Sequence, residues 1–176
     1  AGATRTLEAS AGNAFNRLLN FYEQDHDWLF GHLGYDLKNE LEPLHSSHFD
    51  GIGFPDLFFF VPQIIIQLSI DEISISTQDN SHDAVYREII AMPVPGIEPV
   101  REPVVVQSRI SRDEYFGIIK KLQQHILRGD CYEINFCQEF YAENVSPDPL
   151  AVYRSLSNMS PNPFAAMEIM TWLLGS

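Results

Sequence analysis

The sequence has few positive charges. Only 11 of its 176 residues are Lys or Arg, against 24 Asp and Glu, which gives a formal net charge of −13. Binding to nucleic acid or to an anionic membrane draws its affinity from many Lys and Arg contacts, so this balance argues against both partners. A small anionic substrate remains compatible with the charge, because a binding site needs only a few local cations.

Cysteine is also scarce. Cys131 and Cys137 lie six residues apart in one predicted strand, on the same face but too far apart along it to form a disulfide. We therefore expect free thiols and a cytoplasmic, reducing location. No signal peptide precedes the first motif, and no apolar run approaches the length of a membrane-spanning helix.

Several catalytic signatures are missing. The sequence has no Gly-rich phosphate loop, no Ser-His-Asp order and no C-x-x-C. His45 and His48 have a possible ligand spacing, but they lie in a polar loop without a nearby Cys or carboxylate pattern, so we expect no metal there. We interpret Glu40 and Glu42 as parts of a solvated turn rather than as an acid–base pair.

The composition is that of a globular domain, with 45% hydrophobic and 12% aromatic residues. The patterns predict an α+β fold of layered, mostly antiparallel β-sheets covered by helices. In the first half, Ser10 is a candidate cap for a helix. The inward face of that helix is predicted to carry Phe15, Leu18, Leu19 and Tyr22. A second helix is predicted over 83–90. Strands are predicted over 28–35, 57–61, 64–68 and 73–75. The last three are predicted to form an antiparallel meander. Because the run 57–61 is almost wholly apolar, its strand is predicted to be covered on both faces.

The second half follows a Pro-rich connector over 92–103. It begins with a predicted strand over 104–108, and Ser111 and Glu114 then form a capping box. The helix behind the box ends at Gly129. One face of that helix carries Tyr115, Ile118, Ile119, Leu122 and Ile126. A strand over 131–141, a helix capped by Asp148 and begun by Pro149, and a break at 160–163 complete the prediction.

Five segments resemble the chorismate-utilising enzymes. These segments are G-D-x-Y-E-I-N-x-x-Q at 129–138, D-P-L-A-x-Y-R-x-L at 148–156, P-x-P-F-A-A at 161–166, W-x-F-G-x-L-x-Y-D-L-K-N-E at 28–40 and F-P-D-L-x-F-F at 54–60. The last two, together with Asn135-Phe136-Cys137-Gln138, are most similar to the aminodeoxychorismate (para-aminobenzoate) synthase component I branch.

The resemblance implies the fold and the reaction. It implies one partial domain over 1–176, resembling the N-terminal half of the chorismate-enzyme sandwich. Within it, 1–91 is an N-terminal sheet region, 92–103 the connector and 104–176 the start of the chorismate-binding region. The implied reaction aminates chorismate to 4-amino-4-deoxychorismate for folate synthesis, with ammonia from a glutamine amidotransferase partner and with magnesium as cofactor.

The catalytic half of the family is not in this sequence. Relatives carry a Ser-Pro-Glu-Arg motif, a Pro-Ile-Lys-Gly-Thr segment whose lysine is the proposed nucleophile, and glutamates that hold magnesium. None of these occurs here. We therefore expect no catalytic residue and no metal ligand in this chain, and we interpret it as an N-terminal portion of a longer enzyme, inactive alone.

The resemblance also implies an effector pocket. In several relatives a matching pocket binds tryptophan beside the Pro-x-Pro loop, and the matching residues here are Tyr132, Asn135, Pro163, Phe164 and Ala165.

Two alternative functions remain open. One is anthranilate synthase component I, and the other is a non-catalytic module that binds an aromatic amino acid or an amidotransferase. In relatives, a serine motif from a more N-terminal segment also contributes to the effector pocket. Leu7-Glu8-Ala9-Ser10 is superficially similar to that motif, and we interpret it as a chance match leading into a helix.

Overall fold

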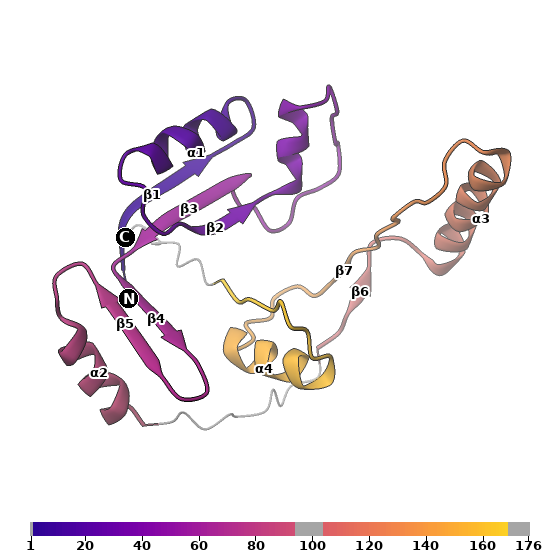
Figure 1. The fold of residues 1–176 in the computed structure, drawn as a ribbon. Coiled ribbons are helices and arrows are strands. Elements are labelled where there is room, and N and C mark those ends of the chain that lie inside the picture. The colour runs from indigo at the N-terminus through magenta and orange to yellow at the C-terminus, as the bar shows by residue number, and fades with distance from the viewer. Residues whose placement is uncertain (1, 94–103, 169–176) are drawn as a thin grey trace. The chain divides into compact units, whose positions relative to one another are not determined.

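A computed structural model of the chain describes residues 2–93 and 104–168 (Figure 1). The chain divides into two compact units, Ala1–Val94 and Pro95–Ser176, and each unit is described by itself. Most of the predicted connector, residues 94–103, lies outside the described residues. The predicted domain bounds therefore stay a prediction.

The first unit is built on a three-stranded antiparallel sheet. Strand β3 (Leu57–Pro62) lies in the centre, between β1 (Ala3–Ala9) and β2 (Phe30–Leu33). Leu57 pairs with Ala9 on one side and with Leu33 on the other. Strand β1 was not predicted, and Leu7 to Ala9 belong to it. The helix into which this segment was predicted to lead begins at Ala14.

Helix α1 (Ala14–Glu23) lies along β1 and closes the core on one face of the sheet (Figure 1). Its cap is Asn13 rather than Ser10. The predicted inward face was largely wrong, because Ala14 and Phe21 are the buried positions while Phe15, Leu19 and Tyr22 are exposed. Of the predicted set only Leu18 packs against the core, which consists of Ala9, Ala14, Leu37 and Leu57.

The other face of this sheet carries aromatic side chains. Because alternate residues of a strand point to opposite faces, Phe58 and Phe60 lie on the face away from Leu57 and Val61. Leu57 and Val61 are buried, whereas Phe58 and Phe60 are half-buried. Neighbouring rings extend this face across β2 and the flanking segments, with centroid separations of 5.6–6.3 Å among Trp28, Phe30, His32, Phe54, Phe58 and Phe60. The strand is thus covered by α1 on one of its two faces.

The remainder of the first unit follows the predictions closely. A short 3-10 helix, η1 (Tyr35–Glu40), comes after β2. Strands β4 (Ile64–Leu68) and β5 (Ile73–Thr77) form an antiparallel hairpin, and α2 (His82–Ala91) packs against β5. The meander was only partly right, because the hairpin forms a sheet of its own and β3 belongs to the other.

The second unit contains two helices whose ends were predicted. Helix α3 (Arg112–Arg128) begins with the complete Ser111–Glu114 capping box, and it ends at Gly129, whose φ of 82° is left-handed. Helix α4 (Pro149–Met159) begins with an Asp148 side chain that accepts a hydrogen bond from the Leu150 N–H. Both predictions are confirmed because each signal acts within a few residues of the helix end.

The strands of the second unit are much shorter than predicted. Within residues 104–168, β6 (Gln107–Ser108) and β7 (Phe140–Tyr141) are the strands that pair, in antiparallel register. Residues 131–139, predicted as most of a strand, are irregular. A strand requires a neighbouring strand as well as a suitable composition, and of the predicted strand 131–141 only Phe140 and Tyr141 pair in a ladder among the described residues.

These elements make an α+β fold in which every sheet pairing among the described residues is antiparallel, as the sequence predicted. Within residues 2–93 and 104–168, no helix is both long enough and apolar enough to cross a membrane.

Candidate functional site

The predicted effector residues all lie in the second unit. Tyr132 and Asn135 follow the turn at Gly129, in the irregular segment where strand alternation does not apply. Tyr132 is 98% exposed and Phe164 94% exposed. No hydrogen bond or ring contact joins the segment 132–135 to the loop 163–165 among the described residues, so the effector pocket stays a prediction.

The Pro-x-Pro loop is ordered by two local contacts. The Asn162 side-chain oxygen accepts a hydrogen bond from the Phe164 N–H at 3.0 Å, which makes a tight turn. The Tyr153 hydroxyl on α4 donates to the Ala165 carbonyl at 3.5 Å. The loop is therefore tied to α4 by the Tyr153 side chain, while the rings of Pro163 and Phe164 remain exposed.

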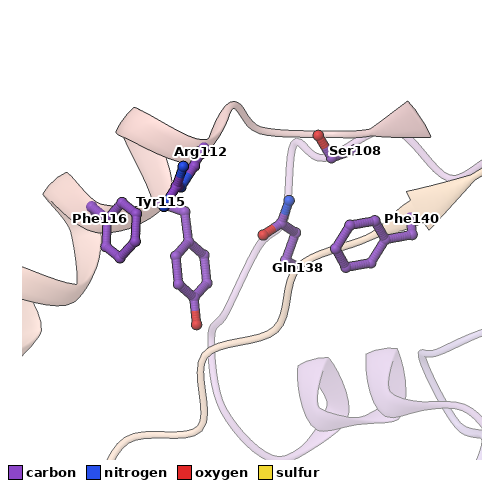
Figure 2. Close-up of a pocket in the computed structure, with 6 residues that line it drawn as sticks. All are labelled: Ser108, Arg112, Tyr115, Phe116, Gln138 and Phe140. Atoms are coloured by element: carbon purple, nitrogen blue, oxygen red, sulfur yellow. The ribbon is translucent and has the colours of Figure 1, made fainter. Parts of the chain in front are cut away.

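A groove lies between α3 and the segment that leads into β7 (Figure 2). It has a volume of about 260 Å³. Its lining combines three aromatic rings with a hydroxyl, an amide and a guanidinium, from Ser108, Arg112, Tyr115, Phe116, Gln138 and Phe140. The sequence analysis did not identify this groove, although Arg112 at the first position of a well-capped helix was a signal that could have marked it.

The base of the groove is fixed by contacts across the short β6–β7 ladder. Arg109 makes a bidentate ion pair with Glu139 (Nε–Oε2 2.8 Å, Nη2–Oε1 3.1 Å) and lies 4.0 Å from the centre of the Tyr141 ring. The hydrogen bond that the Arg109 guanidinium donates to the Glu139 carboxylate raises the pKa of Arg109. Gln138 donates from Nε2 to the Ile110 carbonyl at 3.2 Å. Residues 107–110 and 138–141 are thus tied together at both backbone and side-chain level.

The far end of α3 carries a charged cluster. The Asp130 carboxylate is 2.7 Å from His125 Nδ1 and 2.6 Å from Arg128 Nη2. These contacts, that of His125 first, lower the pKa of Asp130. The cluster ties the Gly129–Asp130 turn to the last turn of the helix, so this part of the matched segment has a structural role.

A second matched segment also has a structural role. Glu40, at the end of η1, accepts hydrogen bonds from the N–H groups of Gly12, Asn13 and Ala14 at 2.6, 2.7 and 2.5 Å. Helix α1 lacks a side-chain cap from Asn13, so the Glu40 carboxylate satisfies donors that would otherwise be free. The interpretation of Glu40 as part of a solvated turn was wrong.

No metal centre can be built from the described residues. Within 2–93 and 104–168, no three His, Cys, Asp or Glu side chains gather closely enough to hold a cation. These residues therefore do not fit a magnesium ion, and we assign them no step through one.

With this geometry in hand, the comparisons with known proteins identify the family. Residues 3–170 match the family described as chorismate binding enzyme. Because the match spans nearly the whole sequence, the chain belongs to the chorismate-binding enzymes, as the matched segments predicted.

The curated relatives carry two different names. The anthranilate synthase component I-like protein of Synechocystis sp. is 26% identical over 149 residues, which are 82% of this chain and 30% of that protein. Anthranilate synthase component 1 of Vibrio cholerae is 26% identical over 92% of this chain and 34% of its own length. Aminodeoxychorismate synthase component 1 of Salmonella typhimurium is 28% identical over 77% of this chain and 30% of its own length. The chain thus spans about a third of the curated relatives that it matches.

A solved structure supports the fold. Anthranilate synthase component I from Streptococcus pneumoniae superimposes with a TM-score of 0.70 at 20% identity, over 93% of this chain and 45% of that one. The likeness shows that the chain adopts part of the chorismate-binding fold. The predicted fold class is confirmed.

Proposed function

We propose that this chain belongs to component I of an aminodeoxychorismate synthase. The reaction replaces the C4 hydroxyl of chorismate with an amino group from ammonia, releases water and yields 4-amino-4-deoxychorismate for folate synthesis. The observation that carries the proposal is the match of residues 3–170 to the chorismate-binding family, together with the segments at 28–40, 54–60 and 129–138 that resemble this branch.

The partners follow from the same proposal. Ammonia comes from a glutamine amidotransferase subunit, and magnesium, held by residues outside this chain, binds the substrate carboxylate. The location is cytoplasmic, in agreement with two free cysteines. Because the chain spans about a third of its relatives and the described residues hold no metal cluster, we propose that the 176 residues alone do not turn over chorismate.

Anthranilate synthase component I is the second candidate, since relatives of similar identity carry that name. Genetic complementation separates the two. We expect the intact gene, with an amidotransferase partner, to restore growth without para-aminobenzoate to a strain that lacks aminodeoxychorismate synthase component I. Rescue only of a tryptophan-requiring strain that lacks anthranilate synthase component I would overturn the proposal in favour of the second candidate.

We further propose that Tyr132, Asn135, Pro163, Phe164 and Ala165 line a tryptophan-binding effector pocket in the intact enzyme. An amide at position 135 suits the carboxylate of an amino acid, so Asn135→Asp should weaken tryptophan binding about tenfold by placing two like charges together. Calorimetry on the intact protein measures this. Equal affinity of the variant and the native protein would contradict the assignment of Asn135.

A further inference from the structure

The groove beside α3 contains one cation without an anionic partner. Arg112 lies with its guanidinium 5.4 Å from the centre of the Phe116 ring, and it makes no hydrogen bond or ion pair in the part of the chain that the structure describes. Two nearby charges are already engaged, because Arg109 is paired with Glu139 and Glu114 accepts both the N–H and the hydroxyl of Ser111. Arg112 is therefore available to a ligand.

The walls of the groove are aromatic. The Tyr115 ring lies 6.1 Å from Phe116, edge to face, and 5.6 Å from Phe136 behind it, which holds its orientation. Figure 2 shows Tyr115 and Phe140 on opposite sides of Gln138. Phe116 and Phe140 are 48% and 65% exposed, so both rings have faces open to a ligand. Aromatic walls favour a flat apolar group, which can stack on them.

Two polar groups complete the lining. The Gln138 amide is oriented by its bond to the Ile110 carbonyl, which leaves Oε1 as an acceptor. The Ser108 hydroxyl, on β6, makes no hydrogen bond among the described residues. These groups can bind one small polar substituent, while the single guanidinium suits a carboxylate bound through two parallel hydrogen bonds.

We propose that this groove binds a small, planar aromatic carboxylic acid. The ring of the acid packs against the aromatic rings that line the groove, and its carboxylate pairs with Arg112. The volume of about 260 Å³ suits a molecule of one ring and excludes a folded peptide element. A cationic ligand is disfavoured because it would face the guanidinium. The proposal rests on the groove alone and does not depend on which reaction the intact enzyme catalyses.

The test is a titration of the intact protein with benzoate, followed by chemical-shift changes in NMR spectra. Two matched probes accompany it: benzyl alcohol, which has the ring but no charge, and cyclohexanecarboxylate, which has the charge but no flat ring. We expect benzoate to bind at least fivefold more tightly than either probe, with shifts centred on the groove. Equal binding of the three, or shifts elsewhere, overturns the proposal.

Two variants test the assigned contacts. Arg112→Gln should weaken benzoate binding about tenfold, because it removes the charge-assisted hydrogen bonds. Lys121→Gln is the matched control, since it removes the same charge from the same helix outside the groove and should bind as the native chain does. Phe140→Leu should reduce the preference for benzoate over cyclohexanecarboxylate. Circular dichroism confirms that each variant retains α3, and equal affinities of Arg112→Gln and Lys121→Gln would overturn the proposal.

Discussion

Gly31 lies where strand β2 passes closest to β3. A Cβ atom at this position would be 1.9 Å from the Phe58 carbonyl oxygen and 2.7 Å from the Phe59 Cα. Both are backbone atoms of the central strand, so they cannot move aside without breaking the ladder. A glycine within a strand often marks a bulge or a close backbone approach, and Gly31 is a case of close approach.

Replacing Gly31 should therefore destabilise the first unit. We expect Gly31→Ala to lower the free energy of unfolding by about 3 kcal/mol, the upper range for forcing extra volume into a packed site. Urea unfolding followed by circular dichroism measures the change. A loss below about 1 kcal/mol would show that β2 and β3 are not as close as described.

Glu40 makes the stability of the first unit depend on pH. The hydrogen bond from the Ala14 N–H, with smaller contributions from Asn13 and Gly12, lowers the pKa of Glu40 below its ordinary value of 4.5. A group whose pKa is lower in the folded state stabilises the protein above its unfolded pKa, and that contribution disappears as the pH falls through the folded value. Stability should thus decline below about pH 4.5.

The variant Glu40→Gln tests this role. It should lower the melting temperature at pH 7 and reduce the loss of stability between pH 5 and pH 3, because the amide cannot be protonated there. Glu42→Gln is the matched control, since the Glu42 carboxylate makes no hydrogen bond or ion pair among the described residues. Thermal unfolding at several pH values measures both. Indistinguishable pH profiles for the two variants would contradict the assignment.

At the scale of elements, local signals predicted structure better than composition did. Helices α3 and α4 were placed correctly because a capping box, a glycine stop and an Asp-Pro start each act within one turn. Strand β1 was missed because its Ala and Thr residues give a weak pattern, and the strand exists through its pairing with β3. Residues 131–139 were predicted as strand for the opposite reason, since their composition is suitable but no described strand pairs with them in a ladder.

The candidate site, too, could be predicted from the sequence only in part. Resemblance suggested Tyr132 and the 163–165 loop, but no single-residue pattern could identify a groove formed by side chains from β6, α3 and the 138–140 segment. Likewise, the donors that Glu40 satisfies belong to residues 12–14, and contacts over such separations are not encoded in local spacing.

Helix α3 offers a further test at this scale. Gly117 lies in its interior, and a Cβ atom there would meet nothing within 4 Å. Since glycine is a poor helix former and no contact forbids a methyl group, Gly117→Ala should stabilise α3 by about 0.5–1 kcal/mol. Helical circular dichroism during a urea titration measures this. A destabilised helix would show that space at Gly117 is needed for a contact that the described residues do not provide.

On the scale of the whole molecule, burial is uneven. Of the buried hydrophobic residues in 2–93 and 104–168, only Ala151 belongs to the second unit, and the apolar face predicted for α3 has no buried member. The first unit holds the rest, around β3 and α1. This distribution agrees with a chain that adopts the chorismate-binding fold over 45% of a solved relative. In our proposal, the remaining residues of the enzyme complete both the core and the catalytic site.

The most direct test of the account is to identify the product formed by the intact gene product from chorismate, magnesium and ammonium. Mass spectrometry and chromatography distinguish the candidate products. We predict 4-amino-4-deoxychorismate from the intact protein and no turnover by the 176-residue chain alone. Formation of anthranilate, or an intact protein that leaves chorismate unchanged, would contradict the proposed function.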